Sequence, residues 1–277
     1  MKLKCPAAIT AAVLLVLFGT TAAWAEQKTI TLASLEWEPY IGSKMPRHGL
    51  TAEIVVATFK RIGYSVDIQF YPWAEALKLG ETGKVDGIFP TYHSKRREEH
   101  FLFSEPFAAS PLGFYKKSVV VAGPNISQLK RAEENIVFPE DPRINQTAVL
   151  KMMKQYKFGV VKGYVNTPEF DAATFLKKVE AASDEKNLRN LINGRVDLIF
   201  IDRYAAKNII VKKFPWHLQN YEFMEPALDH QPLHIGFSKK VAGHRQKLQD
   251  FNRGLIIVKE DGLLKRLTDT YGLRSRF

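Results

Sequence analysis

The sequence has very little cysteine, because Cys5 is the single one among its 277 residues. One cysteine excludes an intramolecular disulfide and a zinc site built from several thiolates. A Walker loop, a Gly-x-Ser-x-Gly elbow and a His-Glu-x-x-His helix are also absent from the sequence. His230 and His234 are four residues apart, but Pro232 between them argues against a helical metal pair. The sequence therefore predicts an ordinary hydrophobic core, with no metal and no cofactor.

Long apolar runs are absent after residue 25, and the single run before it has the features of an export signal. Lys2 and Lys4 precede AAITAAVLLVLFGT, and small residues then lead into AAWAEQK. This order predicts a cleaved secretory signal over residues 1–25. A membrane anchor is the alternative, but the run is short for a bilayer span and no stop-transfer flank follows it. Because Cys5 follows no lipobox, we expect a periplasmic protein without a lipid anchor.

The composition has an excess of positive charge, with 40 Lys and Arg against 29 Asp and Glu and a formal net charge of +11. A basic protein attracts anions in general, and nucleic acid is one such partner. The basic residues are nevertheless spread along the whole chain and alternate with acidic ones, so they form no stripe along a phosphate backbone. Together with export, this distribution argues against nucleic acid as a partner.

Strand and helix patterns alternate past the signal. TITLASL (29–35) and YSVDIQFY (64–71) have the alternating polarity of half-buried strands. Between them, GLTAEIVVATFKRIG (49–63) has apolar residues at helical spacing. A short helix over 73–81 and a strand in VDGIF (85–89) follow. Alternating strands and helices predict an α/β fold with largely parallel sheets.

Two short segments of the sequence recur in the same order. GKVDGIF (83–89) returns as GRVDLIF (194–200), and PLGFYKK (111–117) returns as PLHIGFSKK (232–240). Either similarity alone would be weak evidence of duplication. Two pairs in the same order indicate two lobes built on one plan.

The second pair of segments predicts where the chain crosses between the lobes. The first lobe then comprises residues 26–112 and a return segment over 236–277, and the second lobe comprises residues 113–235. A helical apolar stripe in the return segment supports this division: Leu248, Phe251, Leu255 and Val258. Two lobes joined by two strands form a hinge.

Residues after the two VD-x-IF segments are candidates for ligand contact, because ligands of open α/β sheets bind beyond the carboxyl ends of the strands. Thr91, Tyr92 and then Arg97 follow the first copy, and Asp202 follows the second. Ser94 is a suitable helix N-cap, but a cation such as Arg97 opposes the dipole of a first helical turn. A bound carboxylate would remove this conflict, since the arginine fork can hold it with two hydrogen bonds. The other charges of this turn are expected to form a solvated face: Lys95, Arg96, Glu98 and Glu99.

Aromatic residues lie near the expected strand ends as well. Trp37 and Tyr40 belong to EWEPY, and Trp73 closes the segment FYPW. Flat rings can enclose the apolar body of a small ligand, although any one ring is as often part of a core. Asp202 would complement a cation, and it can also cap the helix that follows it. The cluster of aromatic residues, more than any member, indicates a ligand site.

These motifs together resemble the family 3 extracellular solute-binding proteins, which are periplasmic receptors for polar amino acids that feed ABC importers. The resemblance covers nearly all of the mature chain. It implies a two-lobe type II fold, with a mostly parallel sheet flanked by helices in each lobe and a two-strand hinge. It also implies a monomer that captures a small amino acid or related carboxylate for an ABC permease by hinge closure. It rests on five segments: EWEPY, GLTAEIVVATFKRIG, GKVDGIFPTYHSKRREEHFLFSEPF, FGVVKGYVNTPEF and GRVDLIFID.

The resemblance further implies roles for individual residues. Arg97 matches the family arginine that binds the α-carboxylate of the ligand, and Asp202 matches the acid that receives its α-amino group. Trp37 and Trp73 fall where the family has side chains that flank the ligand. Gly163 matches the turn of the second lobe whose backbone amides and hydroxyl groups complete the carboxylate site.

The sequence departs from the family pattern in two places. Small hydroxyl residues usually follow the glycine of the second lobe, where this chain has Tyr164, Val165 and Asn166. Pro90 and Thr91 replace a more common pair of Ser or Thr residues. Bulk in both places is expected to alter the usual pose of a bound amino acid.

Two other functions fit the same scaffold. An enzyme similar to periplasmic dehydratases or to the regulatory part of murein lyases would need a water-shielded acid or base. Glu38, Glu169 and Asp202 are the nearest candidates, and the sequence singles out none of them. A binding protein without catalytic activity is therefore the prediction. A sensory subunit that docks on a membrane receptor is the third possibility, and it would need a separate signalling partner.

Overall fold

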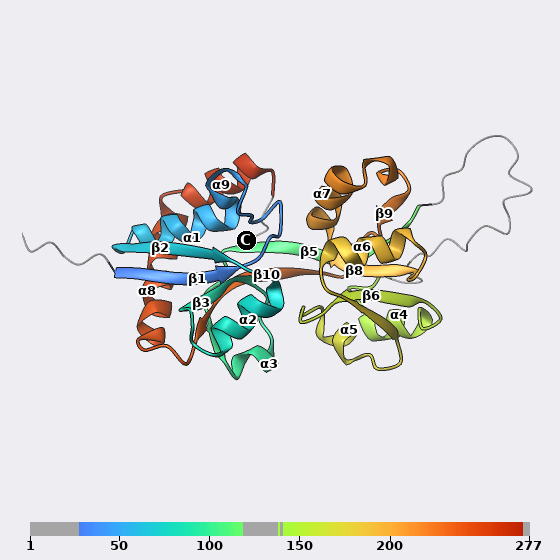
Figure 1. The fold of residues 1–277 in the computed structure, drawn as a ribbon, viewed down its shortest axis with the longest axis horizontal. Helices are drawn as coiled ribbons and strands as arrows, with labels where there is room; N and C mark the ends of the chain where they lie inside the picture. Colours follow the sequence, from blue (N-terminus) through green and yellow to red (C-terminus); the bar gives the residue numbers. More distant parts are fainter. Residues whose placement is uncertain (1–27, 119–137, 139–140, 274–277) are drawn as a thin grey trace, which may run out of the picture.

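The structure is a computed structural model that describes residues 28–118, 138 and 141–273. The expected secretory signal over residues 1–25 lies outside the described residues, as does Cys5. Figure 1 shows two halves of the molecule, each with helices on both sides of its strands.

The first half combines an early segment of the chain with the end of the chain. Its strands are β1 (Lys28–Ser34), β2 (Tyr64–Phe70), β3 (Gly87–Thr91) and β4 (Phe101–Phe103). Its helices are α1 (Leu50–Lys60), α2 (Trp73–Glu81), α3 (Lys95–Glu98), α8 (His244–Glu260) and α9 (Leu263–Tyr271), with the 3₁₀ turn η1 (Pro46–His48) before α1.

The second half is built from the middle of the chain. Its strands are β6 (Lys157–Val161), β7 (Lys177–Ala181), β8 (Leu198–Asp202) and β9 (Tyr221–Phe223). Its helices are α4 (Gln146–Met152), α5 (Pro168–Ala172), α6 (Asp184–Ile192) and α7 (Arg203–Lys213), and the 3₁₀ turn η3 (Pro215–His217) follows α7.

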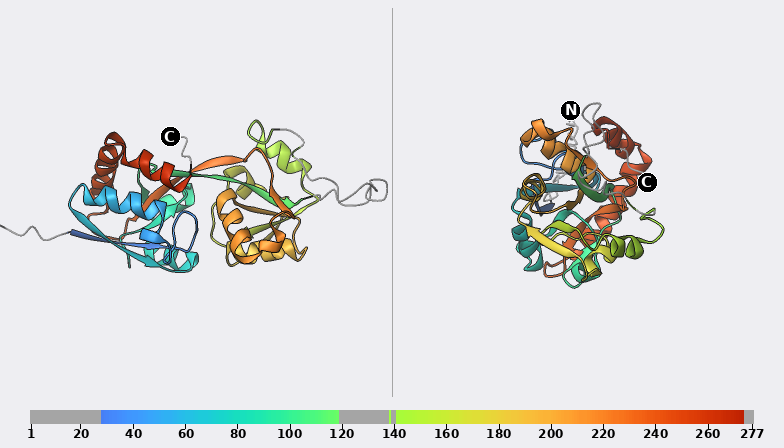
Figure 2. Two further views of the ribbon diagram at one scale, coloured as in Figure 1. Left: turned by 90° about the horizontal axis from the view of Figure 1, so that it is seen from above. Right: turned by 90° about the vertical axis from the view of Figure 1, so that its right-hand side faces the viewer.

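Two long strands, β5 (Ala108–Lys117) and β10 (Asp229–Ser238), connect the halves (Figures 1 and 2). They are antiparallel to one another from Ala108 to Leu112 and from Asp229 to Leu233. The strand order is β2-β1-β3-β10-β5-β8-β6-β7, with β4 added to β10 and β9 added to β5. Strands β1, β2 and β3 are parallel in one half, and β6, β7 and β8 are parallel in the other.

This arrangement confirms the predicted two-lobe type II fold, in which each lobe has a mostly parallel sheet flanked by helices. The first and second halves are called lobe 1 and lobe 2 below. Strand β5 contains the first segment expected to cross between the lobes, residues 111–117. Strand β10 contains most of the second segment, residues 232–240. The expected lobe boundaries, after residues 112 and 235, fall within these strands and stay predictions.

The return segment completes the core of lobe 1. Phe251, Leu255 and Val258 of α8 are buried, as the apolar stripe predicts, and Leu248 is partly buried against the same core. The ring of Phe251 lies 5.2 Å from that of Phe59 on α1, so residues almost 200 positions apart in sequence share one core. Lobe 1 is therefore discontinuous in sequence but continuous in its packing.

The recurring VD-x-IF segments have one structural role in both lobes. The carboxylate of Asp86 accepts a hydrogen bond from the backbone N–H of Thr31 at 2.7 Å, and the N–H of Asp86 donates to the carbonyl of Thr31. Asp197 makes the same two contacts with Lys157, also at 2.7 Å from the backbone N–H to the carboxylate. Each aspartate thus aligns its own strand with the neighbouring parallel strand.

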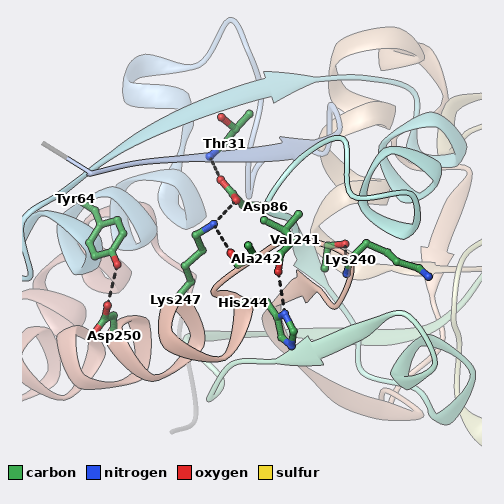
Figure 3. Close-up of polar contacts among 10 residues, drawn as sticks. Thr31, Tyr64, Asp86, Lys240, Val241, Ala242, His244, Lys247 and Asp250 are labelled. Atoms are coloured by element: carbon green, nitrogen blue, oxygen red, sulfur yellow. Dashed lines mark hydrogen bonds and ion pairs between the residues drawn. The ribbon is translucent and has the colours of Figure 1, made fainter. Parts of the chain in front are cut away.

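Asp86 has a further partner from the end of the chain, as Figure 3 shows. The Nζ atom of Lys247 on α8 lies 2.6 Å from the Asp86 carboxylate. Close by, the phenol of Tyr64 donates to Asp250 on the same helix at 2.8 Å. These polar contacts attach the return segment to the strands of lobe 1.

Replacing Asp86 with alanine is expected to lower the free energy of unfolding by about 2–3 kcal/mol, because the Thr31 N–H loses its side-chain acceptor and the Lys247 ammonium loses its charged partner, keeping the carbonyl of Ala242. Asp197→Ala should cost less, about 1 kcal/mol, since Asp197 is exposed to solvent. Urea denaturation measures both changes. Asp67→Ala, an exposed aspartate on β2, is the matched control, with a change within about 0.5 kcal/mol. Equal stability of Asp86→Ala and the control would contradict the role of Asp86.

Candidate ligand site between the lobes

The strand register brings the ends of two parallel strands to one place. Thr91, the last residue of β3, pairs with His234 of β10, and Asp202, the last residue of β8, pairs with Leu112 of β5. Since β5 and β10 pair with each other, both strand ends adjoin the same two-strand connection. The side chains that follow each end therefore face the space where the lobes meet.

Arg97 is held by a short helix directly after β3. Ser94 caps α3, and its hydroxyl accepts a hydrogen bond from the backbone N–H of Arg97 at 3.3 Å. Lys95, Arg96 and Glu98 are exposed, whereas Arg97 is only 4% exposed. The turn thus separates one buried cation from a solvated charged face, as the sequence predicts.

The guanidinium of Arg97 connects the two lobes. Its Nη1 atom donates to the hydroxyl of Thr91 at 2.7 Å and to the carbonyl of Tyr92 at 2.9 Å. Its Nη2 atom donates across the interface to the carbonyl of Gly163 at 3.0 Å. The indole N–H of Trp73 donates to the same carbonyl at 3.2 Å, and the guanidinium lies 5.1 Å from the Trp73 ring centroid.

The Nε atom of Arg97 is buried and has no hydrogen-bond partner among the described residues. Burial, and secondarily the charge of Arg96, lowers the pKa of Arg97 to about 10. Arg97 therefore stays a cation at neutral pH, with a part of its hydrogen-bonding capacity unused.

Asp202 lies on the opposite side of the interface. It caps α7 by accepting from the backbone N–H of Ala205 at 2.7 Å, and its other oxygen accepts from the phenol of Tyr40 in lobe 1 at 2.9 Å. Burial raises the pKa of Asp202 to about 7, against these hydrogen bonds, and the negative charge of Asp184 raises it further.

Asp184 is a site residue that the sequence reading missed. It begins α6 after the N-cap Ser183, so in the sequence it looks like an ordinary acidic residue of a first helical turn. In the structure it is 6% exposed, and one oxygen accepts from the phenol of Tyr164 at 3.2 Å. Burial raises the pKa of Asp184 to about 7, while hydrogen bonding from Tyr164 and Trp37 opposes that rise. No sequence signal identifies it, because its burial depends on side chains from elsewhere in the chain.

Aromatic rings fill the space between these charges. Trp37 stacks on Tyr40 with 4.4 Å between ring centroids and meets Tyr92 edge-on at 6.0 Å. Across the interface, Trp73 of lobe 1 meets Tyr164 of lobe 2 edge-on at 6.4 Å. The bulky Tyr164 that departs from the family pattern is thus part of the contact between the lobes.

The structure brings nine of the ten expected site residues into this one network of contacts: Trp37, Tyr40, Trp73, Thr91, Tyr92, Arg97, Gly163, Tyr164 and Asp202. Asn166 is different, because its amide donates to Asp171 at 2.7 Å and its backbone N–H donates to the same carboxylate. Of the other acids considered from sequence, Glu38 forms an ion pair with Lys212 across the interface.

Two spaces lie beside this network. The inner cavity has a volume of about 30 Å³, room for one water molecule. Its walls include Trp37, Trp73, Thr91, Tyr92, Arg97 and Tyr164. The outer groove has a volume of about 510 Å³ and shares Leu35, Trp37, Trp73 and Tyr164 with the inner cavity, so these four side chains separate the two spaces. An amino acid could reach Arg97 only after the lobes move apart.

The site offers binding chemistry of both signs: a buried guanidinium for a carboxylate, two buried carboxylates for cations, and aromatic faces for an apolar body. Within residues 28–118 and 141–273, no three His, Cys, Asp or Glu side chains gather in a way that could hold a metal ion. None of the described helices is long and apolar enough to cross a membrane.

Comparison with known families gives one match over most of the chain. A model of the bacterial extracellular solute-binding proteins, family 3, matches residues 35–274. A comparison with curated proteins found no match.

Comparison with solved structures finds the same two-lobe fold. An ancestral arginine-binding protein bound to arginine is 18% identical, with a TM-score of 0.67 over 88% of this chain and 97% of that one. A histidine kinase sensor domain with similarity to periplasmic binding proteins is 17% identical, with a TM-score of 0.66 over 88% and 96%. An ancestral amino acid-binding protein, a precursor of cyclohexadienyl dehydratase, is 18% identical, with a TM-score of 0.61 over 89% and 95%.

The two buried carboxyl groups make stability depend on pH. Folding raises the pKa of Asp184 and Asp202 from 3.8 to about 7. Between these values the unfolded chain releases protons that the folded chain keeps, so the free energy of unfolding falls as pH rises from about 4 to about 7. The partly buried His234, whose pKa is lowered by desolvation, acts in the opposite direction.

We therefore expect the wild-type protein to lose more stability between pH 5 and pH 8 than the double variant Asp184→Asn, Asp202→Asn. Urea denaturation at several pH values measures this difference, and comparison of the two proteins removes the contribution of His234. Parallel pH profiles for the two proteins would contradict the assignment of these carboxyl groups.

Proposed function

Because the chain belongs to the bacterial extracellular solute-binding proteins of family 3, we propose that it binds a small amino acid or related carboxylate between its lobes. The observation that carries this proposal is Arg97, a buried cation at the interface. Its Nη2 atom donates to a carbonyl of the other lobe, and its Nε atom has no hydrogen-bond partner in the part of the chain that the structure describes. A ligand carboxylate forms charge-assisted hydrogen bonds with a guanidinium, which are stronger than bonds to a neutral carbonyl.

The position of the opposite charge supports an amino acid in particular. Asp202 belongs to lobe 2 and is fully buried beside Tyr40 of lobe 1, so a ligand amino group would bridge the lobes there. A ligand that contacts both lobes binds the closed form more tightly than the open form, and it therefore shifts the equilibrium toward the closed form. The paired strands β5 and β10 would serve as the hinge for this motion.

The proposed setting is the periplasm, where the closed form would present the ligand to an ABC permease. The expected signal over residues 1–25 and the family membership support export and this partner. Sensing is an alternative use of the same closure, and one structural relative is a sensor domain of a histidine kinase. The identity of the neighbouring genes, a permease in one case and a kinase in the other, would distinguish the two roles.

Catalysis is a second candidate function, which the buried carboxyl groups favour. A general acid or base works best with a pKa near the operating pH, and burial raises the pKa of Asp202 and Asp184 to about 7. Incubation of the protein with prephenate-like acids or peptidoglycan tests it. Turnover by the wild-type protein that is lost in Asp202→Asn would establish an enzyme. If the wild-type protein turns over neither substrate, binding without catalysis is favoured.

The receptor is tested by calorimetric titration of the refolded, ligand-stripped protein with amino acids and organic acids. Arg97→Ala is expected to weaken binding of any amino-acid ligand by at least about 100-fold, because loss of one partner of a buried charged pair costs on the order of 3 kcal/mol. Arg97→Lys, which keeps the charge but loses the fork, should weaken binding by a smaller factor.

Arg96→Ala is the matched control for this test. Arg96 is the neighbouring arginine on the same turn, but it is exposed. Its removal should leave the dissociation constant within about twofold, since exposed charges away from the ligand contribute little. Unchanged affinity in a folded Arg97→Ala variant would refute the carboxylate site.

A further inference from the structure

Buried charge between the lobes is unbalanced. Asp184 and Asp202 are two buried carboxyl groups, and the negative charge of Asp184 raises the pKa of Asp202, so both lie in one electrostatic environment. Arg97 is the buried cation among the described residues that line the inner cavity. With all three groups ionised, these three side chains together have a net charge of one negative unit.

Asp184 interacts with neutral donors alone among the contacts that the structure describes. The phenol of Tyr164 donates to one of its oxygens, and the indole of Trp37 also stabilises its charged form. Its Oδ1 atom is buried and has no hydrogen-bond partner among the described residues. A buried carboxylate without a cation is costly, whereas pairing with a ligand cation would offset that cost.

Asp184 also lies where a ligand side chain would extend. It lines the outer groove together with Trp37, Trp73 and Tyr164, the same three rings that border the inner cavity next to Arg97. The side chain of an amino acid held at Arg97 and Asp202 would therefore extend past these rings into the outer groove, and not into the protein core.

The outer groove itself is predominantly acidic. Its lining contains four carboxylates, those of Glu36, Glu38, Asp184 and Glu185, and two ammonium groups, those of Lys212 and Lys213. Lys212 is already paired with Glu38 across the interface. An acidic groove with aromatic walls attracts cations and can contact them through the ring faces.

We propose that Asp184 is a specificity-determining residue that binds a cationic side chain, and that the ligand is a basic amino acid. This inference rests on the proposed function, because it places the α-carboxylate at Arg97 and the α-amino group at Asp202. A zwitterion with a neutral side chain leaves the three side chains one negative unit from balance. A ligand with a net charge of +1 balances these three groups, and its protonated side chain pairs with Asp184, which contacts neither α-group.

The test compares ligands that have the same shape but differ in charge. Calorimetric titrations of the ligand-stripped protein use L-arginine against L-citrulline, and L-lysine against L-norleucine. At least one cationic ligand is expected to bind tenfold or more tightly than its neutral counterpart. Asp184→Asn, which keeps a hydrogen-bond acceptor but removes the charge, should reduce that ratio to about twofold or less. Asp67→Asn, the same change at an exposed position of lobe 1, should leave the ratio as it is.

The outcomes separate this inference from the proposed function. If neutral ligands bind as tightly as cationic ones, and Arg97→Ala abolishes that binding, the receptor stands and the inference is overturned. If none of the four amino acids binds, the inference is overturned, whereas the receptor fails only if the wider set of amino acids and organic acids also gives no binding. A cationic preference that persists in folded Asp184→Asn also overturns the role of Asp184. The ratio in the wild-type protein needs no variant, so the charge preference is tested even if Asp184→Asn does not fold.

Discussion

The antiparallel pairing of β5 with β10 determines where everything else in this molecule lies. The two strands connect the lobes, and each also pairs with a parallel strand of one lobe, β10 with β3 and β5 with β8. This register brings Thr91 and Asp202, the ends of β3 and β8, to the same two-strand connection. Side chains from residues 37 to 202 can therefore form a single site, although local sequence connects few of them.

The buried charged groups where the lobes meet contact neutral groups. Between the lobes, Arg97 donates to the carbonyl of Gly163 and Asp202 accepts from Tyr40, and within lobe 2 Asp184 accepts from Tyr164. Hydrogen bonds of this kind satisfy a charge only in part, because a neutral partner brings no opposite charge into the low-dielectric interior. A ligand with matching charges would form stronger bonds with the same groups. These contacts between the lobes are thus compatible with an exchange of protein contacts for ligand contacts.

Two acids of similar burial, Asp202 and Asp184, differ in how readily the sequence reveals them. Asp202 follows a strand whose sequence repeats an earlier strand, so its position beyond a strand end can be inferred. Asp184 follows a serine cap at the start of a helix, which is where an exposed acid is commonly found. Tyr164 and Trp37, whose contacts give Asp184 its character, lie 20 and 147 positions earlier in the chain, and no periodic pattern connects them to it.

The sequence by itself determined the two-lobe α/β fold, the helix at Trp73–Glu81, the apolar stripe of α8 and the burial of one arginine among charged neighbours. These features follow from local hydrophobic periodicity, turn residues and an internal repeat, which short stretches of sequence contain. Only the tertiary structure decided that Asn166 turns to Asp171, that Tyr164 packs against Trp73 across the lobes, and that Asp184 is buried. The physical reason is that burial and hydrogen-bond partners depend on residues distant in sequence, and the pairing of β5 with β10 is what brings them together.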